Sequence, residues 1–178
     1  MPPAWSPCTA DREANPEAPY FLSLGFKTLV AGVRTRWTDY TVRYDLRAGG
    51  VDPAKWHHAA ASFDAITHSL VLYVDGVQVA QGVGASSTGN LLPLEFGRNR
   101  LRSGKYFEGK VDDIRVWIVV RSAGQIAVNY KNELTNAPTG LVANWKFNDA
   151  TGSSVVDSAG NHPASLFGSA RYSTAFHP

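Results

Sequence analysis

Three carboxylates lie close together in the second half of the sequence, where hydrolytic chemistry is the first reaction to consider. Glycoside hydrolysis needs two carboxyl groups held roughly 5–9 Å apart across a groove. Glu108, Asp112 and Asp113 fall on residues 106–118, where alternating apolar and polar residues predict a long strand. Glu108 and Asp112 would share one face of that strand, with Asp113 on the other. No second glutamate follows on it, so the pattern does not favour an enzyme.

Other catalytic motifs do not occur in the sequence. It contains no Gly-x-Ser-x-Gly, no His-Glu-x-x-His and no phosphate-binding loop. Cys8 is the single cysteine, which excludes a disulfide within the chain. His57 and His58 are adjacent, so on a strand their side chains point to opposite faces and cannot chelate one ion together. We expect one of them to lie inside and the other at the surface.

A basic loop is the clearest candidate for binding a ligand. Residues 99–105 read NRLRSGK, and another arginine precedes them. Clustered guanidinium groups bind carboxylates or phosphates, often through two parallel hydrogen bonds. A solvated connection between strands has the same composition, and that alternative stays open. Together with two residues at the start of another predicted strand, the candidate ligand-binding residues are Trp37, Asp39, Arg98, Asn99, Arg100 and Arg102.

The elements that would position these residues are predicted to be β-strands. Residues 55–81 contain two alternating apolar runs joined by Asp75-Gly76, the strongest short signal for a tight hairpin, and we predict a three-strand antiparallel meander. A short helix over 122–130 should begin with a capping box of Ser122 and Gln125. The other predicted strands cover 20–24, 27–33, 38–46, 92–97 and 106–118.

Composition and charge indicate a globular domain. A chain of 178 residues can bury a sizeable core, and its 18% charged and 44% hydrophobic residues argue against disorder. Seventeen basic and fifteen acidic side chains give a net charge of +2, which provides no electrostatic case for nucleic acid or an anionic membrane. No window approaches the ~18 apolar residues of a membrane span. Residues 1–19 read as an irregular, proline-rich leader without the apolar core of a signal peptide.

Two motifs resemble those of laminin-G-like jelly-roll domains, which belong to the concanavalin A-like lectin/glucanase superfamily and are relatives of the pentraxins. One is WHHxAxxFD at 56–64, followed by LxLYVDGV at 70–77; the other is FEGKVDDIRVW at 107–117, followed by the predicted helix. The resemblance implies an all-β, antiparallel two-sheet jelly-roll sandwich with one short helix. Glucanases of this fold carry Glu-x-Asp-x-x-Glu on one strand, a pattern that this sequence lacks.

The C-terminal segment resembles the start of the same family's domain, although here it comes last. Trp145 and Phe147 are followed by the DSAGN turn at 157–161. Either residues 140–178 return to supply the opening strands of a circularly permuted sandwich, in their own chain or exchanged with a partner, or they begin a further copy in a tandem array. Burial of each large apolar side chain contributes ~1.5–3 kcal/mol, which favours docking. We therefore predict a single domain over 20–178.

The resemblance implies a non-catalytic recognition module that binds carbohydrate or a protein surface through rim loops, outside the cell or at its surface. Family members often bind calcium at the rim, and oxygen-bearing residues at and near the DSAGN turn would suit that ion: Asp157, Asn161, Asn148 and Asp149. An Asx-turn in which Asp157 caps its own backbone is the alternative. A structural domain that forms homo-oligomers by exchanging its C-terminal strand, and a glycoside hydrolase of this fold, also stay open.

Overall fold

A computed structural model describes residues 19–25, 27–35, 38–86, 93–98, 106–149 and 151–173. The chain forms two compact units, Met1–Gly109 and Lys110–Pro178, and each is described by itself. All strand pairs among the described residues are antiparallel, and these residues include one short helix. The predicted fold class is therefore confirmed. The single domain over 20–178, with 140–178 supplying its opening strands, stays a prediction.

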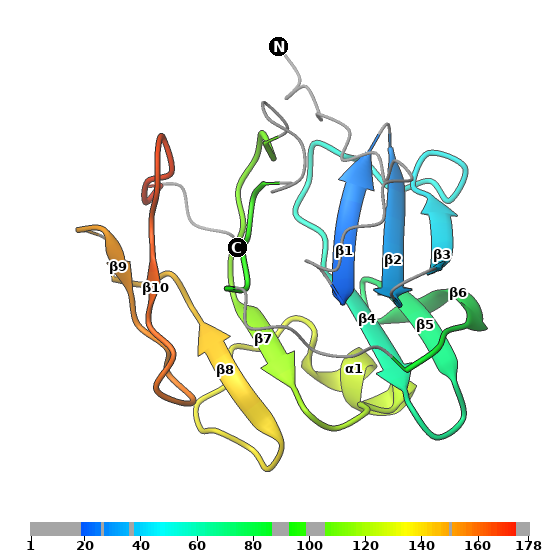
Figure 1. Cartoon of the computed structure of the whole chain (residues 1–178). Helices are drawn as coiled ribbons and strands as arrows, with labels where there is room; N and C mark the ends of the chain where they lie inside the picture. The colour runs from blue at the N-terminus through cyan, green and yellow to red at the C-terminus, as the bar shows by residue number, and fades with distance from the viewer. Residues whose placement is uncertain are drawn as a thin grey trace. The chain divides into compact units, whose positions relative to one another are not determined.

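The first sheet of the N-terminal unit contains three consecutive strands, in the order β1-β2-β3 (Figure 1). They are β1 (Tyr20–Gly25), β2 (Thr28–Arg34) and β3 (Asp39–Asp45). In the register, Leu22 lies opposite Ala31, which in turn lies opposite Val42. Because neighbouring strands in register present the same face, these three positions point to one side of the sheet. The strands begin and end within a residue of the predicted bounds.

The second sheet is the predicted meander, with the order β4-β5-β6. Its strands are β4 (Ala59–Asp64), β5 (Ser69–Val74) and β6 (Val77–Val83). Asp75 and Gly76 connect β5 to β6 with φ angles of 49° and 77°. Positive φ at both central residues defines the tight turn whose twist matches that of the paired strands. The Asp-Gly signal therefore located this hairpin correctly.

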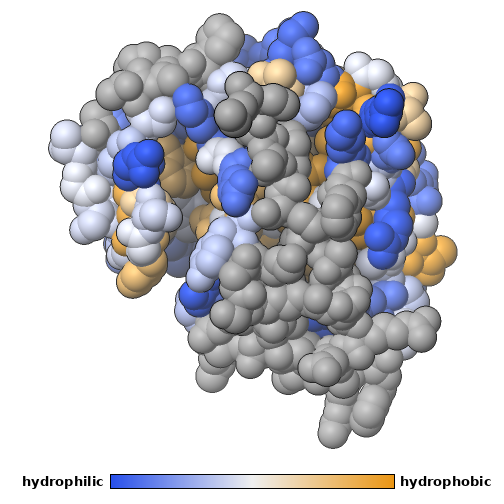
Figure 2. Space-filling model, turned by 90° about the horizontal axis from the view of Figure 1, so that it is seen from above, coloured by the Kyte–Doolittle hydropathy of each residue, from blue (hydrophilic) through white to orange (hydrophobic). Residues whose placement is uncertain are grey.

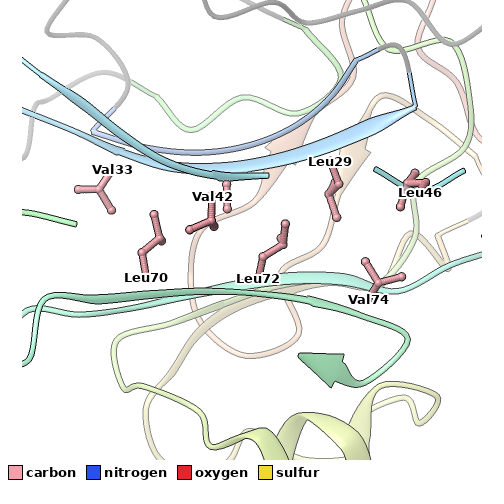
Figure 3. Packing of buried hydrophobic residues seen from close by; sticks show 8 residues of the cluster. Leu29, Val33, Val42, Leu46, Leu70, Leu72 and Val74 are labelled. Atoms are coloured by element: carbon pink, nitrogen blue, oxygen red, sulfur yellow. The ribbon is translucent and has the colours of Figure 1, made fainter. Parts of the chain in front are cut away.

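The core of the N-terminal unit lies between these two sheets. Leu70, Leu72 and Val74, which alternate along β5, point toward the opposite sheet: Leu70 lies near Val33 and Val42, and Val74 lies near Leu46 (Figure 3). Each of these side chains is buried. Their two-residue period puts every second side chain of the strand into one apolar layer, and this layer joins the two sheets.

The C-terminal unit is built from short strand pairs and a helix. Strand β7 (Ile114–Trp117) pairs with β8 (Leu141–Trp145), and β9 (Ser154–Val155) pairs with β10 (Ala164–Ser165). Helix α1 (Ala123–Asn129) begins at the predicted capping box: Ser122 Oγ accepts from the Gln125 amide, and the Gln125 side chain accepts from the Ser122 amide. Trp145 and Val155 are buried, whereas Val156 and Phe167 stay exposed.

Two predicted strands are wrong in extent. Residues 93–97 of the predicted 92–97 strand are not in a strand, and Leu92 lies outside the described residues. The long strand predicted over 106–118 is reduced to the four residues of β7. Positive φ angles at Gly97 (80°) and Asp113 (47°) turn the backbone away from the extended conformation. Pro93 also lacks the N–H that a sheet ladder needs.

The core predicts a strong effect at one position of β5. Leu72 is fully buried, with 0% of its surface exposed, and Leu72→Ala should lower the free energy of unfolding by about 2–5 kcal/mol because it leaves a cavity. Ile66, in the turn before β5, is 91% exposed, so Ile66→Ala should change the free energy of unfolding by less than about 0.5 kcal/mol. Urea unfolding of both variants measures the difference, and equal effects would contradict the assigned core.

Candidate functional site

The two ends of the predicted basic loop are held together. Arg98 forms an isolated antiparallel bridge with Tyr106, and the Phe107 amide donates to the Gly97 carbonyl oxygen at 2.7 Å. The left-handed backbone at Gly97 directs the chain into this closure. The predicted contacts Asn99, Arg100 and Arg102 belong to the loop itself and lie outside the described residues.

Arg98 is paired with a carboxylate that sequence analysis did not single out. Its Nε donates to Glu95 Oε2 at 2.9 Å and its Nη2 to Glu95 Oε1 at 2.6 Å, so the pair is joined by two hydrogen bonds. The hydrogen bonds to Glu95 raise the pKa of Arg98. A guanidinium has five N–H groups, so three remain for other acceptors. In the sequence, only the spacing of three residues between Glu95 and Arg98 indicated that the two side chains could form an ion pair.

Tyr106 provides an exposed aromatic surface next to this ion pair. The side chain belongs to the residue that bridges Arg98, and 58% of its surface is exposed. An aromatic ring offers a flat apolar face, and the phenol adds one hydroxyl that donates and accepts. We call Glu95, Arg98 and Tyr106 the loop-base site. It combines a flat apolar surface with planar donors and acceptors, which suits a ligand rich in hydroxyl groups.

The second predicted contact, Asp39, has a structural partner. Arg34 donates from Nε to Asp39 Oδ1 at 2.6 Å and from Nη2 to Asp39 Oδ2 at 2.9 Å. The Arg34 side chain is only 10% exposed and lies over the Phe21 ring, 5.6 Å from its centroid. Removing one member of such a pair leaves a poorly solvated charge, so Asp39 stabilises the end of the β2–β3 hairpin. Trp37 lies outside the described residues.

Asp157, the leading calcium candidate, is enclosed by N–H donors. Its side chain is 1% exposed. Oδ1 accepts from the amides of Asn144 at 2.8 Å and Ala159 at 3.0 Å, and Oδ2 accepts from the His162 amide at 3.2 Å. Burial alone would raise the pKa of Asp157, but these amides, with that of Gly160, hold it below its ordinary value. This arrangement includes the Asx-turn that was the alternative to a metal site.

The same turn supports the tryptophan of β8. Trp145 Nε1 donates to the His162 carbonyl oxygen at 2.8 Å, and Trp145 bridges Asp157 through the backbone. At Gly160, an added Cβ would lie 2.6 Å from the Val142 carbonyl oxygen, closer than any side chain allows. Glycine is therefore required for the turn to pack against β8. Trp145, Asp157 and Gly160 of this segment therefore pack together as one structural unit.

Two of the other proposed calcium ligands form hydrogen bonds with different residues. Asn148 Nδ2 donates to Glu133 Oε1 at 3.1 Å, and Asp149 Oδ2 accepts from the Tyr172 hydroxyl at 3.0 Å. Asn161 is exposed. Within the described ranges, no group of three or more His, Cys, Asp or Glu residues is arranged to hold a metal ion. The Asp157 carboxylate does not fit a calcium ligand in this arrangement, and calcium binding stays a prediction.

The aspartates considered for hydrolysis hold the C-terminal unit together. Asp112 Oδ1 accepts from the Asp113 amide at 2.9 Å. Asp113 forms an ion pair with Arg115, and its Oδ1 also accepts from Asn144 Nδ2 at 2.7 Å. Arg115 additionally donates to the Asn129 carbonyl oxygen at the end of α1, at 3.2 Å. Asp113 therefore links β7 to β8, and Arg115 links it to α1, so both oxygens of the Asp113 carboxylate are engaged.

One small pocket is found among the described residues of the N-terminal unit. A pocket lined by Lys27, Leu46, Arg47, Val51 and Pro53 has a volume of about 40 Å³, far below the roughly 300–1,000 Å³ of typical small-molecule sites. Seen from above, the described residues mix hydrophilic and hydrophobic side chains in small areas (Figure 2). This pocket is too small to enclose a drug-sized ligand.

Among the described residues, no helix has the length and apolar character required to cross a membrane.

Comparison with known proteins assigns a family and a related structure. A family model described as the Concanavalin A-like lectin/glucanases superfamily, of laminin G type, matches residues 4–127. A solved structure from Bacteroides ovatus, called a "putative carbohydrate binding protein", is 20% identical with a TM-score of 0.63 and covers 84% of this chain. This chain spans 48% of that protein's chain, about half its length. At this identity the likeness shows the fold alone.

A second solved structure is an S-layer domain-containing protein from Clostridium thermocellum. It is 18% identical over 61% of this chain and 54% of its own, and its TM-score of 0.36 is too low to carry an argument. A search of curated proteins gives no significant match.

The enclosure of Asp157 predicts a loss of stability on the acid side. Asp157→Asn should lower the free energy of unfolding by about 1.5–3 kcal/mol at neutral pH, because at least one buried amide loses its charged acceptor. Since its pKa is lowered in the folded state, the contribution is present above the ordinary value of 3.8 and lost as pH falls below it. Urea unfolding from pH 2.5 to 7 measures this, with Asn161→Ala in the same turn as the control. Equal stability of Asp157→Asn and wild type at pH 7 would contradict the assignment.

Proposed function

This chain belongs to the concanavalin A-like lectin/glucanases superfamily, and from that premise we propose that it is a non-catalytic module that binds carbohydrate at the loop-base site. The observation that carries the proposal is the exposed Tyr106, whose backbone bridges that of Arg98, next to the doubly hydrogen-bonded Arg98–Glu95 pair. The name of the related Bacteroides ovatus structure, a carbohydrate-binding one, supports the same class of ligand.

The chemistry of the site matches the two kinds of surface that a sugar presents. A pyranose ring has a face of C–H groups that packs on an aromatic ring, which Tyr106 offers. Its hydroxyls both donate and accept, and the carboxylate of Glu95 accepts where the guanidinium of Arg98 donates. An ion pair held by two hydrogen bonds already restrains both side chains, so less side-chain entropy is lost on binding.

The engagement of Asp112, Asp113 and Glu95 supports binding over hydrolysis, whereas Glu108 is exposed. Hydrolysis requires one carboxyl group free to donate a proton and a second free to attack or to activate water. Asp112 and Asp113 are hydrogen-bonded within the C-terminal unit, and Asp113 is also ion-paired with Arg115. Glu95 is bound to Arg98 through both oxygens. A module of this kind binds glycans outside the cell or at the cell surface, and we propose the same location for this protein.

Binding should be lost when the aromatic face is removed. Tyr106→Ala should weaken affinity for the best glycan ligand about tenfold, which corresponds to the ~1.4 kcal/mol that such a ring contributes. A glycan array identifies the ligand, and isothermal titration calorimetry then compares Tyr106→Ala with Ile66→Ala, an exposed apolar residue of another turn, whose affinity should equal that of wild type. An array without any bound glycan, or an unchanged affinity of Tyr106→Ala, would contradict the proposal. Slow cleavage of the bound glycan would instead support an enzyme.

Calcium dependence is tested separately. If a calcium ion binds only the folded state through Asp149, Asn148 or Asn161, calcium at 100 times its Kd should add about 2.7 kcal/mol to the stability. Thermal melting with calcium and after EDTA measures this shift, and Asp149→Asn should abolish it. Identical melting temperatures in calcium and EDTA would remove calcium from the proposal and leave the loop-base site unaffected.

A further inference from the structure

The imidazole of His57 lies between two oxygen acceptors. Its Nδ1 is 2.7 Å from Asp75 Oδ2, in the β5–β6 turn, and its Nε2 is 2.7 Å from the Asp52 carbonyl oxygen. The ring therefore connects the 52–58 segment, which precedes β4, to the turn that joins β5 and β6. Both partners belong to the N-terminal unit; Asp75 is 18 positions from His57 in sequence, and Asp52 is 5 positions from it.

Only one protonation state of His57 satisfies both contacts. Neutral imidazole has one N–H and one bare nitrogen, whereas the imidazolium ion has two N–H groups. A backbone carbonyl and an ionised carboxylate can accept but cannot donate. Neutral His57 would therefore place a nitrogen lone pair against an oxygen on one side, and doubly protonated His57 makes two charge-assisted hydrogen bonds.

We propose that His57 is a pH-sensitive latch, which fastens the β5–β6 turn to the 52–58 segment while its ring is doubly protonated and releases it when one proton is lost. Release requires no other group to titrate. The segment that it holds includes the exposed Trp56, so the latch controls how firmly that aromatic side chain is presented.

The second half of the latch is built from the backbone around Asp75. Asp75 Oδ1 accepts from the His58 amide at 2.9 Å, and the Asp75 amide donates to the His58 carbonyl oxygen at 2.9 Å. Asp75 itself has left-handed backbone. The two strand ends are thus held by a reciprocal pair of bonds, and His57 adds the pH-dependent one. The exchange of the Asp75 amide reports directly on whether this junction is closed.

Among the described residues, the charged groups that act on the ring, Asp75 and Asp52, lie on these two segments. Asp75 faces Nδ1, while the Asp52 side chain accepts from the Ala54 amide at 3.0 Å and lies 3.9 Å from Lys55 Nζ. Burial disfavours the charged ring, but the hydrogen bonds to Asp75 and to the Asp52 carbonyl outweigh it and raise the pKa of His57 above 6.5. Because the folded-state pKa is raised, the latch stabilises fully below pH 6.5 and is lost as pH rises through the folded value.

Two measurements on the full chain test the latch. NMR titration of the imidazole should give His57 a pKa above 6.5, and Asp75→Asn should lower it, since asparagine tolerates the left-handed backbone but removes the charge. Hydrogen exchange of the Asp75 amide, corrected for its intrinsic rate, should show an opening constant that rises between pH 6 and 9. The rise should be about tenfold for each unit by which the pKa is raised. In His57→Gln, the opening constant should not change with pH.

Two outcomes would overturn the proposal. One is a His57 pKa at or below 6.5, which would mean that the ring is neutral in the folded state. The other is an Asp75 opening constant whose pH dependence is the same in wild type and in His57→Gln. The Ala80 amide, in the middle of β6, serves as an internal control. Its opening constant, corrected in the same way for the intrinsic exchange rate, should not change with pH in this range.

Discussion

The exclusion of water from between two three-stranded sheets is the constraint on which the N-terminal unit depends. Leu70, Leu72 and Val74 form one layer with residues of the opposite sheet because β5 keeps a two-residue alternation. A slip of one residue in β5 would turn this layer toward solvent. The Asp75-Gly76 turn sets the pairing of β5 with β6 next to it, and one register shift between Leu72 and Tyr73 changes the pairing further along the strands. His57, through Asp75, secures that turn to the preceding segment.

Polar contacts have the equivalent role in the C-terminal unit, whose strands are short. Asn144 is 1% exposed, donates to Asp113 Oδ1 from its side chain and to Asp157 Oδ1 from its amide. Buried polar groups of this kind are favourable only when each donor and acceptor is satisfied. Asp113 and Asp157, both of which resemble functional carboxylates in sequence, are satisfied here by structural partners. Instead of catalysing a reaction or binding a metal ion, these two carboxylates position β7, β8 and the 157–162 turn.

Features determined by neighbouring residues could be predicted from the sequence. The alternation of Val42 and Leu46, the Asp75-Gly76 hairpin and the Ser122–Gln125 capping box depend on residues within a few positions of one another, and the structure has all three. The strand over 106–118 could not be bounded in this way. At its break, Asp113 has a left-handed backbone and accepts a hydrogen bond from Asn144, which is 31 residues away. Asp157 has local amide partners as well as that of Asn144, 13 residues away, and only the local ones could be expected from the DSAGN turn.

The candidate site was predicted only in part, for the same physical reason. Arg98 was identified because guanidinium groups are numerous near it, whereas Glu95 and Tyr106 became evident only when the loop ends were seen to meet. Asp39 was identified by its place at a strand start, yet its carboxylate neutralises the buried Arg34. Residue type indicated where charge would be found. Whether that charge is available depends on a partner that only the fold supplies.

The pairing of Arg98 with Glu95 has a consequence for how a ligand arrives. Opposite charges joined by two short hydrogen bonds form a dipole whose field falls off quickly, so the pair does not attract an ion over a distance. At the proposed site, this pair by itself would therefore add little long-range attraction to the encounter with a ligand, and salt would have little of its field to screen. The contribution of the pair would then be made after contact, through the rate at which a well-fitted ligand leaves.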